Sequence, residues 1–321
     1  MKAARIVQPG QMEVVEIPCP EPAPDEVLIR VMASGICGTD VHIFRGEYLG
    51  GYPIIPGHEF SGVVEAVGSQ VKRFKPGDRV AVEPNISCDN CEACLNNRQN
   101  FCLNWSAVGV TRPGAMEQLT TAPEKVVFDI GELSFEQAAF MEPLSCVLHG
   151  LERLAPELAD KVAILGAGPI GLLLLQGIRA QGASQVTVVD KNAARMRLAG
   201  ELGAGITLND LNALKTNYYD VVIDATGAIP VMARSIDFVR PGGRVLLFGV
   251  PPTGKEMCIE PFKIFNKGLT VMSSYTSVRN SYQALDLLHA GRIQVEGLVS
   301  HRLPLEDFQR GIEMIEQGAD G

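Results

Sequence analysis

A glycine-rich stretch after an apolar segment constrains the fold more than any other feature of the sequence. Residues 161–165 read KVAIL, and Gly166-x-Gly168-x-x-Gly171 follows at once. The first glycine permits a tight turn, the second lets a ligand approach the backbone, and the third allows close packing of helix and strand. We expect a strand over 162–165 and then a helix whose N-terminus faces phosphates. A bare glycine triplet could also be a turn in another α/β fold.

A second apolar strand, residues 185–189, ends at Asp190, which lies 19 residues after Gly171. A carboxylate at this position of a dinucleotide site accepts hydrogen bonds from the adenosine ribose. Its charge repels the 2′-phosphate of NADP, so the sequence predicts NAD. Lys191 and Arg195 follow closely. They either soften that preference or line a solvated helix face.

The alternation of strands and helices continues towards the C-terminus. YDVVIDATG predicts a strand that ends at Asp224, GGRVLLFGV one that ends near 249–250, and GLTVMSSY one that ends at 273–275. Such alternation implies a parallel sheet, and ligands bind at the carboxyl ends of its strands. The predicted cofactor contacts on these segments are Thr226, Gly249, Val250, Ser274 and Tyr275.

The N-terminal part has a different pattern, with short apolar runs such as EVLIRVMASG between glycines and prolines. This pattern predicts an all-β, barrel-like domain. Two amphipathic helices are expected in the tail, where the chain returns to the first domain. The chain has 321 residues, of which 46% are hydrophobic, enough for two cores. We expect one domain over 1–145 and 279–321 and a second over 146–278.

Four of the eight cysteines lie within residues 88–102, as Cys88-x2-Cys91-x2-Cys94-x7-Cys102. Closely spaced thiolates suit a tetrahedral zinc ion, and four of them leave no position for a substrate. The cluster therefore predicts a structural zinc lobe. Free or disulfide-paired cysteines and an iron–sulfur cluster are the alternatives.

A second group of possible zinc ligands is spread along the chain: Cys37, His58, Glu59 and Glu142. A catalytic zinc takes three protein ligands of these types and keeps a fourth position open. Singly, each residue also has a structural interpretation, since a lone cysteine is often a small buried apolar residue. The spacing alone leaves both interpretations open.

Charge excludes some classes of function. The net charge of -9 argues against a nucleic-acid partner, and no basic run is present to bind a membrane surface. The N-terminal MKAARIVQPG has no long apolar core, so we expect no signal peptide and a cytoplasmic protein.

Taken together, these motifs resemble the zinc-dependent medium-chain dehydrogenase/reductase (alcohol dehydrogenase) family over essentially the whole chain. The matching pieces are GICGTDVHIFRG, GHEFSGVV, the four-cysteine lobe, EPLSCVLHG and GAGPIG with VVD. The resemblance implies an α/β protein with a GroES-like β-barrel catalytic domain, a doubly wound Rossmann coenzyme domain and an active-site cleft between them. MEPLS resembles the sorbitol (polyol) dehydrogenase branch, and threonine dehydrogenase is the next nearest.

The resemblance also implies roles for individual residues. Cys37, His58 and either Glu59 or Glu142 bind the catalytic zinc, and Thr39 and His42 match proton-relay positions. Ile170, Asp190 and Arg195 match dinucleotide contacts. The implied cofactors are two Zn²⁺ ions and NAD, and the implied reaction is hydride transfer from a secondary alcohol, a polyol or sugar alcohol, in a homo-oligomer (tetramer or dimer).

The rival interpretations are L-threonine as substrate, a noncatalytic NAD- and zinc-binding protein, and a zinc-free quinone reductase. Two departures from the polyol branch bear on the substrate and the chain end. Tyr275 and Arg279 do not align with the arginine and tyrosine that hold substrate hydroxyls there, and relatives usually continue past the final GADG. The particular polyol, its stereochemistry and any phosphate group stay open.

Overall fold

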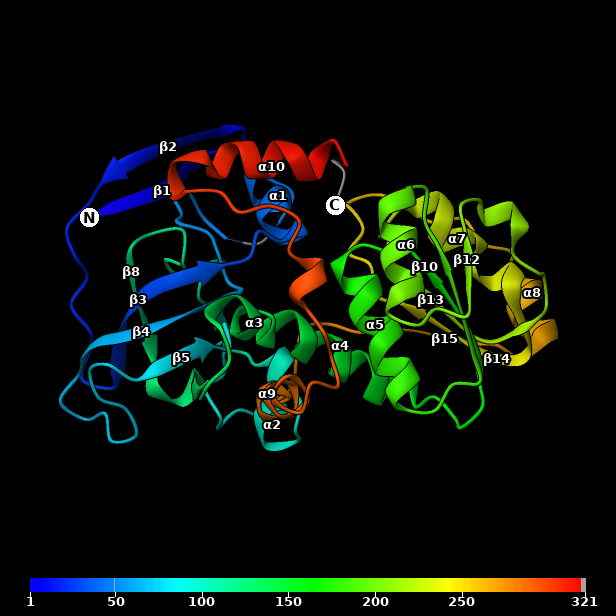
Figure 1. Ribbon diagram of the computed structural model, residues 1–321, viewed down its shortest axis with the longest axis horizontal. Coiled ribbons are helices and arrows are strands. Elements are labelled where there is room, and N and C mark those ends of the chain that lie inside the picture. The colour runs from blue at the N-terminus through cyan, green and yellow to red at the C-terminus, as the bar shows by residue number, and fades with distance from the viewer. Residues whose placement is uncertain (49, 319–321) are drawn as a thin grey trace. The chain divides into compact units, whose positions relative to one another are not determined.

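The computed structural model describes residues 1–48 and 50–318, and the chain divides into two compact units (Figure 1). The first unit contains Met1–Ser145, Ser277–His289 and the described part of His301–Ala319. The second unit contains Cys146–Thr276 and Ala290–Ser300.

The first unit is built on a five-stranded antiparallel sheet with the strand order β8-β3-β4-β5-β9. These strands are β3 (Glu26–Ser34), β4 (Phe60–Val67), β5 (Arg79–Val82), β8 (Leu119–Pro123) and β9 (Val127–Asp129). Their inward side chains, among them Ile29, Phe60 and Val80, form a closely packed apolar cluster. The β-rich character expected of the N-terminal part is confirmed, but the all-β expectation is wrong, because this part also contains helices at Gly38–Arg45, Glu92–Leu95 and Phe135–Ala139.

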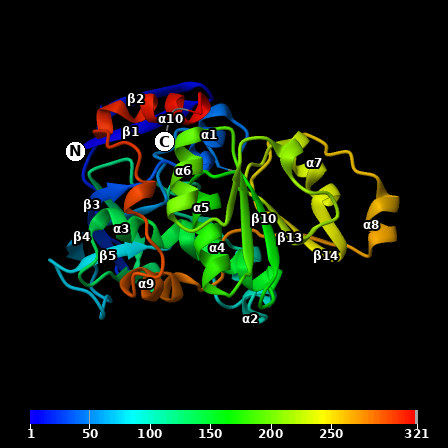
Figure 2. The ribbon, with the colours of Figure 1, turned by 45° about the vertical axis from the view of Figure 1, so that its right-hand side comes forward.

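A hairpin of β1 (Lys2–Gln8) and β2 (Gln11–Glu16) flanks this sheet. Figure 2 shows α10 (Phe308–Glu316) beside the hairpin and α1 (Gly38–Arg45), where Val41 and Ile312 share one apolar cluster. The other helices of this unit include α3 (Phe135–Ala139) and α9 (Ser281–His289). The two expected tail helices are therefore confirmed as α9 and α10.

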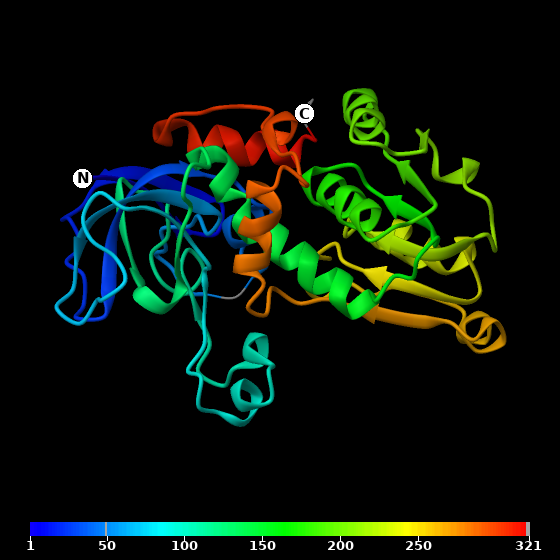
Figure 3. The ribbon, with the colours of Figure 1, turned by 60° about the horizontal axis from the view of Figure 1, so that its bottom comes forward.

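The cysteine-rich segment forms a small lobe that extends away from the sheet strands of the first unit (Figure 3). Its elements are β6 (Asn85–Ile86), α2 (Glu92–Leu95), the 3₁₀ turn η1 (Gln99–Phe101) and β7 (Ser106–Ala107). The pairing of β6 with β7 closes the base of this lobe.

The second unit is a six-stranded parallel sheet with the order β12-β11-β10-β13-β14-β15. The strands are β10 (Lys161–Leu165), β11 (Gln185–Val189), β12 (Ile206–Leu208), β13 (Tyr219–Asp224), β14 (Val239–Leu247) and β15 (Thr270–Ser273). The central strands are near-continuous apolar runs because helices cover both faces of such a sheet. β14 ends at Leu247, earlier than the predicted 249–250, because the next two amides turn back to the carbonyl of Asp224.

Helices α5 (Pro169–Ala180) and α6 (Ala193–Glu201) cover one face of this sheet, and α7 (Ile229–Phe238) and α8 (Pro261–Lys267) the other (Figure 2). The helix α4 (Met141–Leu154) links the two units in sequence. Neither these nor the other helices within residues 1–48 and 50–318 combine the length and apolar character needed to cross a bilayer.

The carboxyl ends of five parallel strands lie in register. Val189 pairs with Leu165, Leu165 with Asp224, Asp224 with Leu247, and Leu247 with Ser273. The segments that follow these strands therefore emerge along one edge of the sheet, and the strand order reverses between β10 and β13.

Candidate functional site

The first unit brings Cys37, His58 and Glu59 together. One ligand atom from each lies within 4.8 Å of the others. The cause is strand pairing: the end of β3 pairs with the start of β4 through Ser34 and Phe60. Cys37 follows the first strand and caps α1, while His58 and Glu59 directly precede the second strand. An antiparallel register thus joins two motifs that are separated in sequence.

Glycine at position 35 makes room for the Glu59 side chain. A Cβ atom on Gly35 would lie 2.3 Å from Glu59 Oε2, and the Gly35 amide donates to the Glu59 carbonyl at 2.7 Å. Gly57 has φ +94°, and a Cβ there would lie 2.9 Å from the backbone nitrogen of Met116. Both positions therefore require glycine for the chain to fold around the three ligand atoms.

Asp40 orients this cluster, a role that the sequence reasoning missed. Its side chain is fully buried and accepts hydrogen bonds from the amides of Cys37 (2.8 Å) and Gly57 (3.2 Å). Asp40 Oδ1 also lies 3.5 Å from His58 Nδ1, without hydrogen-bond geometry. The sequence signal was the spacing of a capping box, in which an acidic side chain three residues after the helix cap accepts a hydrogen bond from the backbone amide of the cap residue.

A divalent cation would replace the protons that the buried groups of this cluster otherwise hold. Burial, with a smaller contribution from the nearby Glu59 carboxylate, raises the pKa of the Cys37 thiol to about 11. Burial would lower the pKa of His58, but Asp40 and Cys37 raise it well above its usual value, while burial raises the pKa of Glu59. A divalent cation stabilises thiolate and carboxylate against such burial, and the two charges would neutralise it. The donor set therefore fits zinc.

The three other residues of the predicted catalytic set lie outside this group. Glu142, at the start of α4, is only 7% exposed, but it is not in the group of three ligand atoms. Thr39 and His42 lie on α1, and His42 Nδ1 is 3.0 Å from Glu47 Oε2. No motif pointed to Glu47, because a contact across five residues at a helix end has no distinctive spacing.

The four cysteines of the lobe converge in the same manner. Their sulfur atoms all lie within 4.8 Å of one another, with Cys91–Cys94 at 3.5 Å and Cys88–Cys94 at 4.0 Å. A tetrahedron with Zn–S bonds of about 2.3 Å has edges of about 3.8 Å, so the spacing fits zinc. Backbone amides of Cys88 (3.2 Å) and Asn104 (3.3 Å) donate to Cys102 Sγ. The pKa of the Cys88 thiol is lowered to about 6, and its hydrogen bond with the Asn90 backbone is the largest cause.

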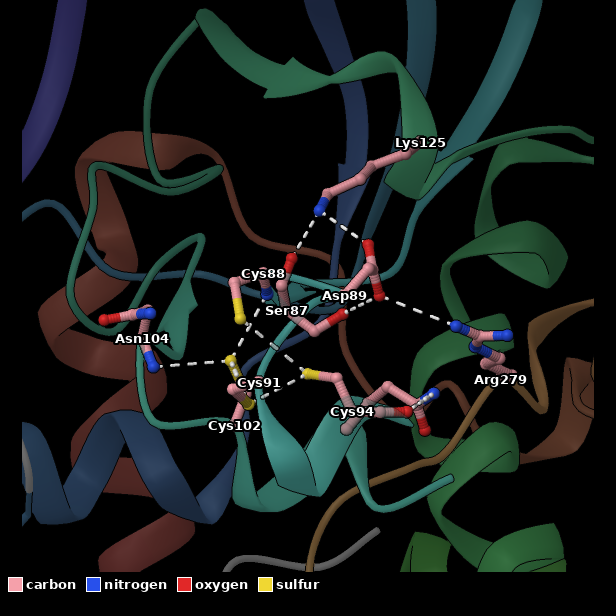
Figure 4. Close-up of polar contacts among 10 residues, drawn as sticks. Ser87, Cys88, Asp89, Cys91, Cys94, Cys102, Asn104, Lys125 and Arg279 are labelled. Atoms are coloured by element: carbon pink, nitrogen blue, oxygen red, sulfur yellow. Dashed lines mark hydrogen bonds and ion pairs between the residues drawn. The ribbon is translucent and has the colours of Figure 1, made fainter. Parts of the chain in front are cut away.

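An ionic cluster fastens the lobe to its surroundings in the first unit. Figure 4 shows Asp89, between the first two cysteines, facing Lys125 and Arg279. The Lys125 ammonium lies 2.9 Å and the Arg279 guanidinium 3.5 Å from the Asp89 carboxylate. Arg279 thus has an acidic partner in the lobe.

The glycine loop of the second unit has the geometry that its sequence predicts. Gly166 has φ +104°, and a Cβ on Gly171 would lie 2.0 Å from the Gly166 carbonyl oxygen. Gly168 caps α5, and a Cβ there would meet nothing within 4 Å. Open space in front of a helix N-terminus, next to Ile170 in the first turn, fits the phosphates of a dinucleotide.

Asp190 lies beside this loop. Its two oxygens accept hydrogen bonds from the amides of Ala167 (2.7 Å) and Asn192 (2.8 Å). Asn192 in turn caps α6 by accepting from the amides of Ala194 and Arg195. Lys191 is exposed, and Arg195 is partly buried.

The remaining predicted contacts follow the aligned strand ends, and they are Thr226, Gly249, Val250, Ser274 and Tyr275. Val250 is 55% exposed. The hydroxyl of Ser274 is buried and has no hydrogen-bond partner within the described residues. A buried orphan hydroxyl at this edge of the sheet fits a site that a polar ligand completes.

Comparison with known proteins agrees with this architecture. Residues 23–132 match the family model of the alcohol dehydrogenase GroES-like domain, and residues 169–290 match that of the zinc-binding dehydrogenases. The chain therefore belongs to the zinc-binding, medium-chain alcohol dehydrogenase family, as the motifs indicated, and it is an oxidoreductase.

Several relatives align over nearly their full length. D-altritol 5-dehydrogenase of Agrobacterium fabrum is 36% identical over 96% of this chain and 94% of its own. D-arabinitol dehydrogenase 1 of Uromyces fabae is 32% identical over 98% of this chain and 93% of its own. L-threonine 3-dehydrogenase of Escherichia coli K12 is 32% identical over 96% of this chain and 94% of its own. A Sinorhizobium meliloti 1021 protein described as a zinc-binding dehydrogenase, solved with NADP, has a TM-score of 0.92 at 36% identity (97% and 94%).

Proposed function

We propose that this protein oxidises a secondary alcohol of the polyol or sugar-alcohol class with NAD as coenzyme and zinc at the Cys37 cluster. The observation that carries the proposal is the convergence of Cys37, His58 and Glu59 within 4.8 Å. The relatives that act on D-altritol and D-arabinitol support a polyol as the substrate class. L-threonine is the second candidate, because an L-threonine 3-dehydrogenase is 32% identical.

The residues of the first unit would divide the work. Cys37, His58 and Glu59 would hold the catalytic zinc, with Asp40 fixing the backbone beside them through the amides of Cys37 and Gly57. When bound, the zinc supplies Lewis-acid polarisation of the substrate oxygen and the coenzyme accepts the hydride. The Thr39 hydroxyl would accept the alcohol proton as it passes its own proton on towards His42, and His42, paired with Glu47 at 3.0 Å, would release a proton to solvent. The four lobe cysteines would hold a second, structural zinc.

The first experiment measures NADH formation with a panel of polyols, sugar-alcohol phosphates, simple secondary alcohols and L-threonine, with and without a zinc chelator. Chelator-sensitive turnover of a polyol is the expected result. Preference for L-threonine would move the protein to the second candidate. No turnover of any substrate, with NADH still bound, would overturn the proposed substrate classes and favour the noncatalytic alternative.

A variant pair tests the metal assignment. Cys37→Ser is expected to abolish turnover and to remove about one zinc per chain. NADH binding should stay unchanged, because the substitution alters only the cluster of Cys37, His58 and Glu59. The matched control is Cys19→Ser, at an exposed cysteine outside both clusters. Retained turnover in Cys37→Ser would overturn the ligand assignment.

A further inference from the structure

The carboxylate of Asp224 is buried at the centre of the parallel sheet without a cationic partner among the ion pairs of the described residues. Asp224 is 0% exposed and ends β13. Its Oδ1 accepts from the Thr226 hydroxyl (2.6 Å) and amide (3.3 Å), and its Oδ2 accepts from the Gly227 amide (3.1 Å). Burial raises the pKa of this carboxyl, while these bonds lower it. Both oxygens are thus used to shape the loop that follows the strand.

The same residue also holds the loop after β14. Its backbone carbonyl accepts from the amides of Phe248 and Gly249, both at 2.9 Å. A Cβ on Gly249 would lie 2.0 Å from the Gly227 nitrogen and 2.8 Å from Asp224 Oδ2. The two loops are therefore in contact through glycines, and the carboxylate lies at that contact.

The glycine loop after β10 meets the same place. The Ala225 amide donates to the Leu165 carbonyl at 2.8 Å, and a Cβ on Gly166 would lie 2.9 Å from Thr226 Cγ2. Three loops that carry predicted dinucleotide contacts therefore meet at the turn that Asp224 begins.

We propose that Asp224 is a positioning residue for the dinucleotide, an inference that rests on the proposed function. Fully buried, and with both oxygens bonded to Thr226 and Gly227, it does not touch the coenzyme. It sets the positions of the loops after β13 and β14. Without the full carboxylate, the buried donors of Thr226 and Gly227 lose an acceptor, which is costly, and the loop after β13 rearranges. Because Gly227 packs directly against Gly249, this rearrangement displaces the loop after β14 as well.

The test is the affinity for NADH, measured by fluorescence titration of Asp224→Asn. The amide keeps the shape but places an NH₂ donor against backbone and hydroxyl donors. We expect the Kd for NADH to rise about tenfold or more, which is about 1.4 kcal/mol. The kcat at saturating NAD should stay within about threefold and the zinc content unchanged, because Asp224 contacts neither reactant nor metal ligand. Hydrogen exchange should accelerate in residues 225–228 and 248–250.

The matched control is Asp220→Asn at the other end of the same strand. Asp220 accepts from the Lys161 amide at 2.8 Å and pairs with Arg240, so its loss should lower the melting temperature without changing the Kd for NADH. A folded Asp224→Asn with wild-type affinity would overturn the inference. If Asp224→Asn does not fold, Gly249→Ala disturbs the same loop contact, and unchanged affinity there would overturn it equally. Failure of the wild type to bind NADH would instead overturn the proposed function.

Discussion

The Asp190 carboxylate accepts a hydrogen bond from the Ala167 amide at 2.7 Å, which joins the end of β11 to the glycine loop. The other oxygen accepts from the Asn192 amide at 2.8 Å. These two bonds hold a negative charge at the edge of the sheet, where the adenosine ribose of a dinucleotide binds in such folds.

This relationship predicts coenzyme choice. Asp190→Asn keeps the size of the side chain but removes the charge that repels a 2′-phosphate. We expect the NAD-to-NADP ratio of kcat/KM to fall about tenfold or more, since 1.4 kcal/mol corresponds to a factor of ten. Steady-state kinetics with both coenzymes measures it. Glu201→Gln, at an exposed acid at the end of α6, is the control, and an unchanged ratio in Asp190→Asn would contradict the prediction.

A second prediction separates the two glutamates. Glu59→Gln should weaken zinc binding at the Cys37 cluster by at least about tenfold, because Glu59 offers one of the three convergent ligand atoms and loss of even a partner of a ligand costs about 10- to 100-fold. Glu142→Gln should retain the zinc, because Glu142 is not in that group of ligand atoms. Zinc content after dialysis against increasing chelator gives both values. Loss of metal in Glu142→Gln with retention in Glu59→Gln would reverse the assignment.

A third prediction concerns the lobe. Cys94 is only 4% exposed, and replacing it with serine removes one of four convergent sulfur atoms. We expect Cys94→Ser to lose about one zinc per chain and to melt roughly 10 °C lower, since structural zinc contributes directly to folding. Calorimetry and metal analysis measure the two effects. Cys258→Ser, at an exposed cysteine, is the control. A wild-type melting temperature in Cys94→Ser would show that the lobe is stable without the sulfur atom of Cys94.

The fourth prediction is a pH dependence of stability. Burial raises the pKa of Glu117 from 4.5 to about 7, and its side chain has little exposure. Because the folded protein holds this proton more tightly than the unfolded chain, the free energy of unfolding falls as the pH rises from about 4.5 to about 7. Glu117→Gln should remove this pH-dependent decrease, which is at most about 3 kcal/mol in the free energy of unfolding.

The measurement compares melting temperatures of Glu117→Gln and wild type at two pH values. The variant should be more stable at pH about 8 and gain nothing at pH about 3, where wild-type Glu117 is protonated in both the folded and the unfolded state. Glu21→Gln, at an exposed glutamate, should follow the wild type at both values. An equal gain at both pH values would mean that the carboxyl charge is not the cause.

Much of the second unit was predictable from sequence because its determinants are local. Apolar runs, the glycine triplet and the acid at Asp190 each depend on neighbours a few residues away, and β10 and β11 lie where these patterns place them. The same holds for the four lobe cysteines, whose short spacing already limits how far apart the sulfur atoms can be.

Tertiary structure decided what depends on pairing between distant segments. Only the register of β3 with β4 places Cys37 against His58 and Glu59, in a group of possible ligand atoms that does not include Glu142. The contacts of Asp89 with Arg279 and of Asp224 with the loop after β14 arise in the same way. A sequence determines by itself which chemical groups are available and which local turns they favour. Their distances across strands and loops are set by the packing of the whole domain, because no local interaction fixes them.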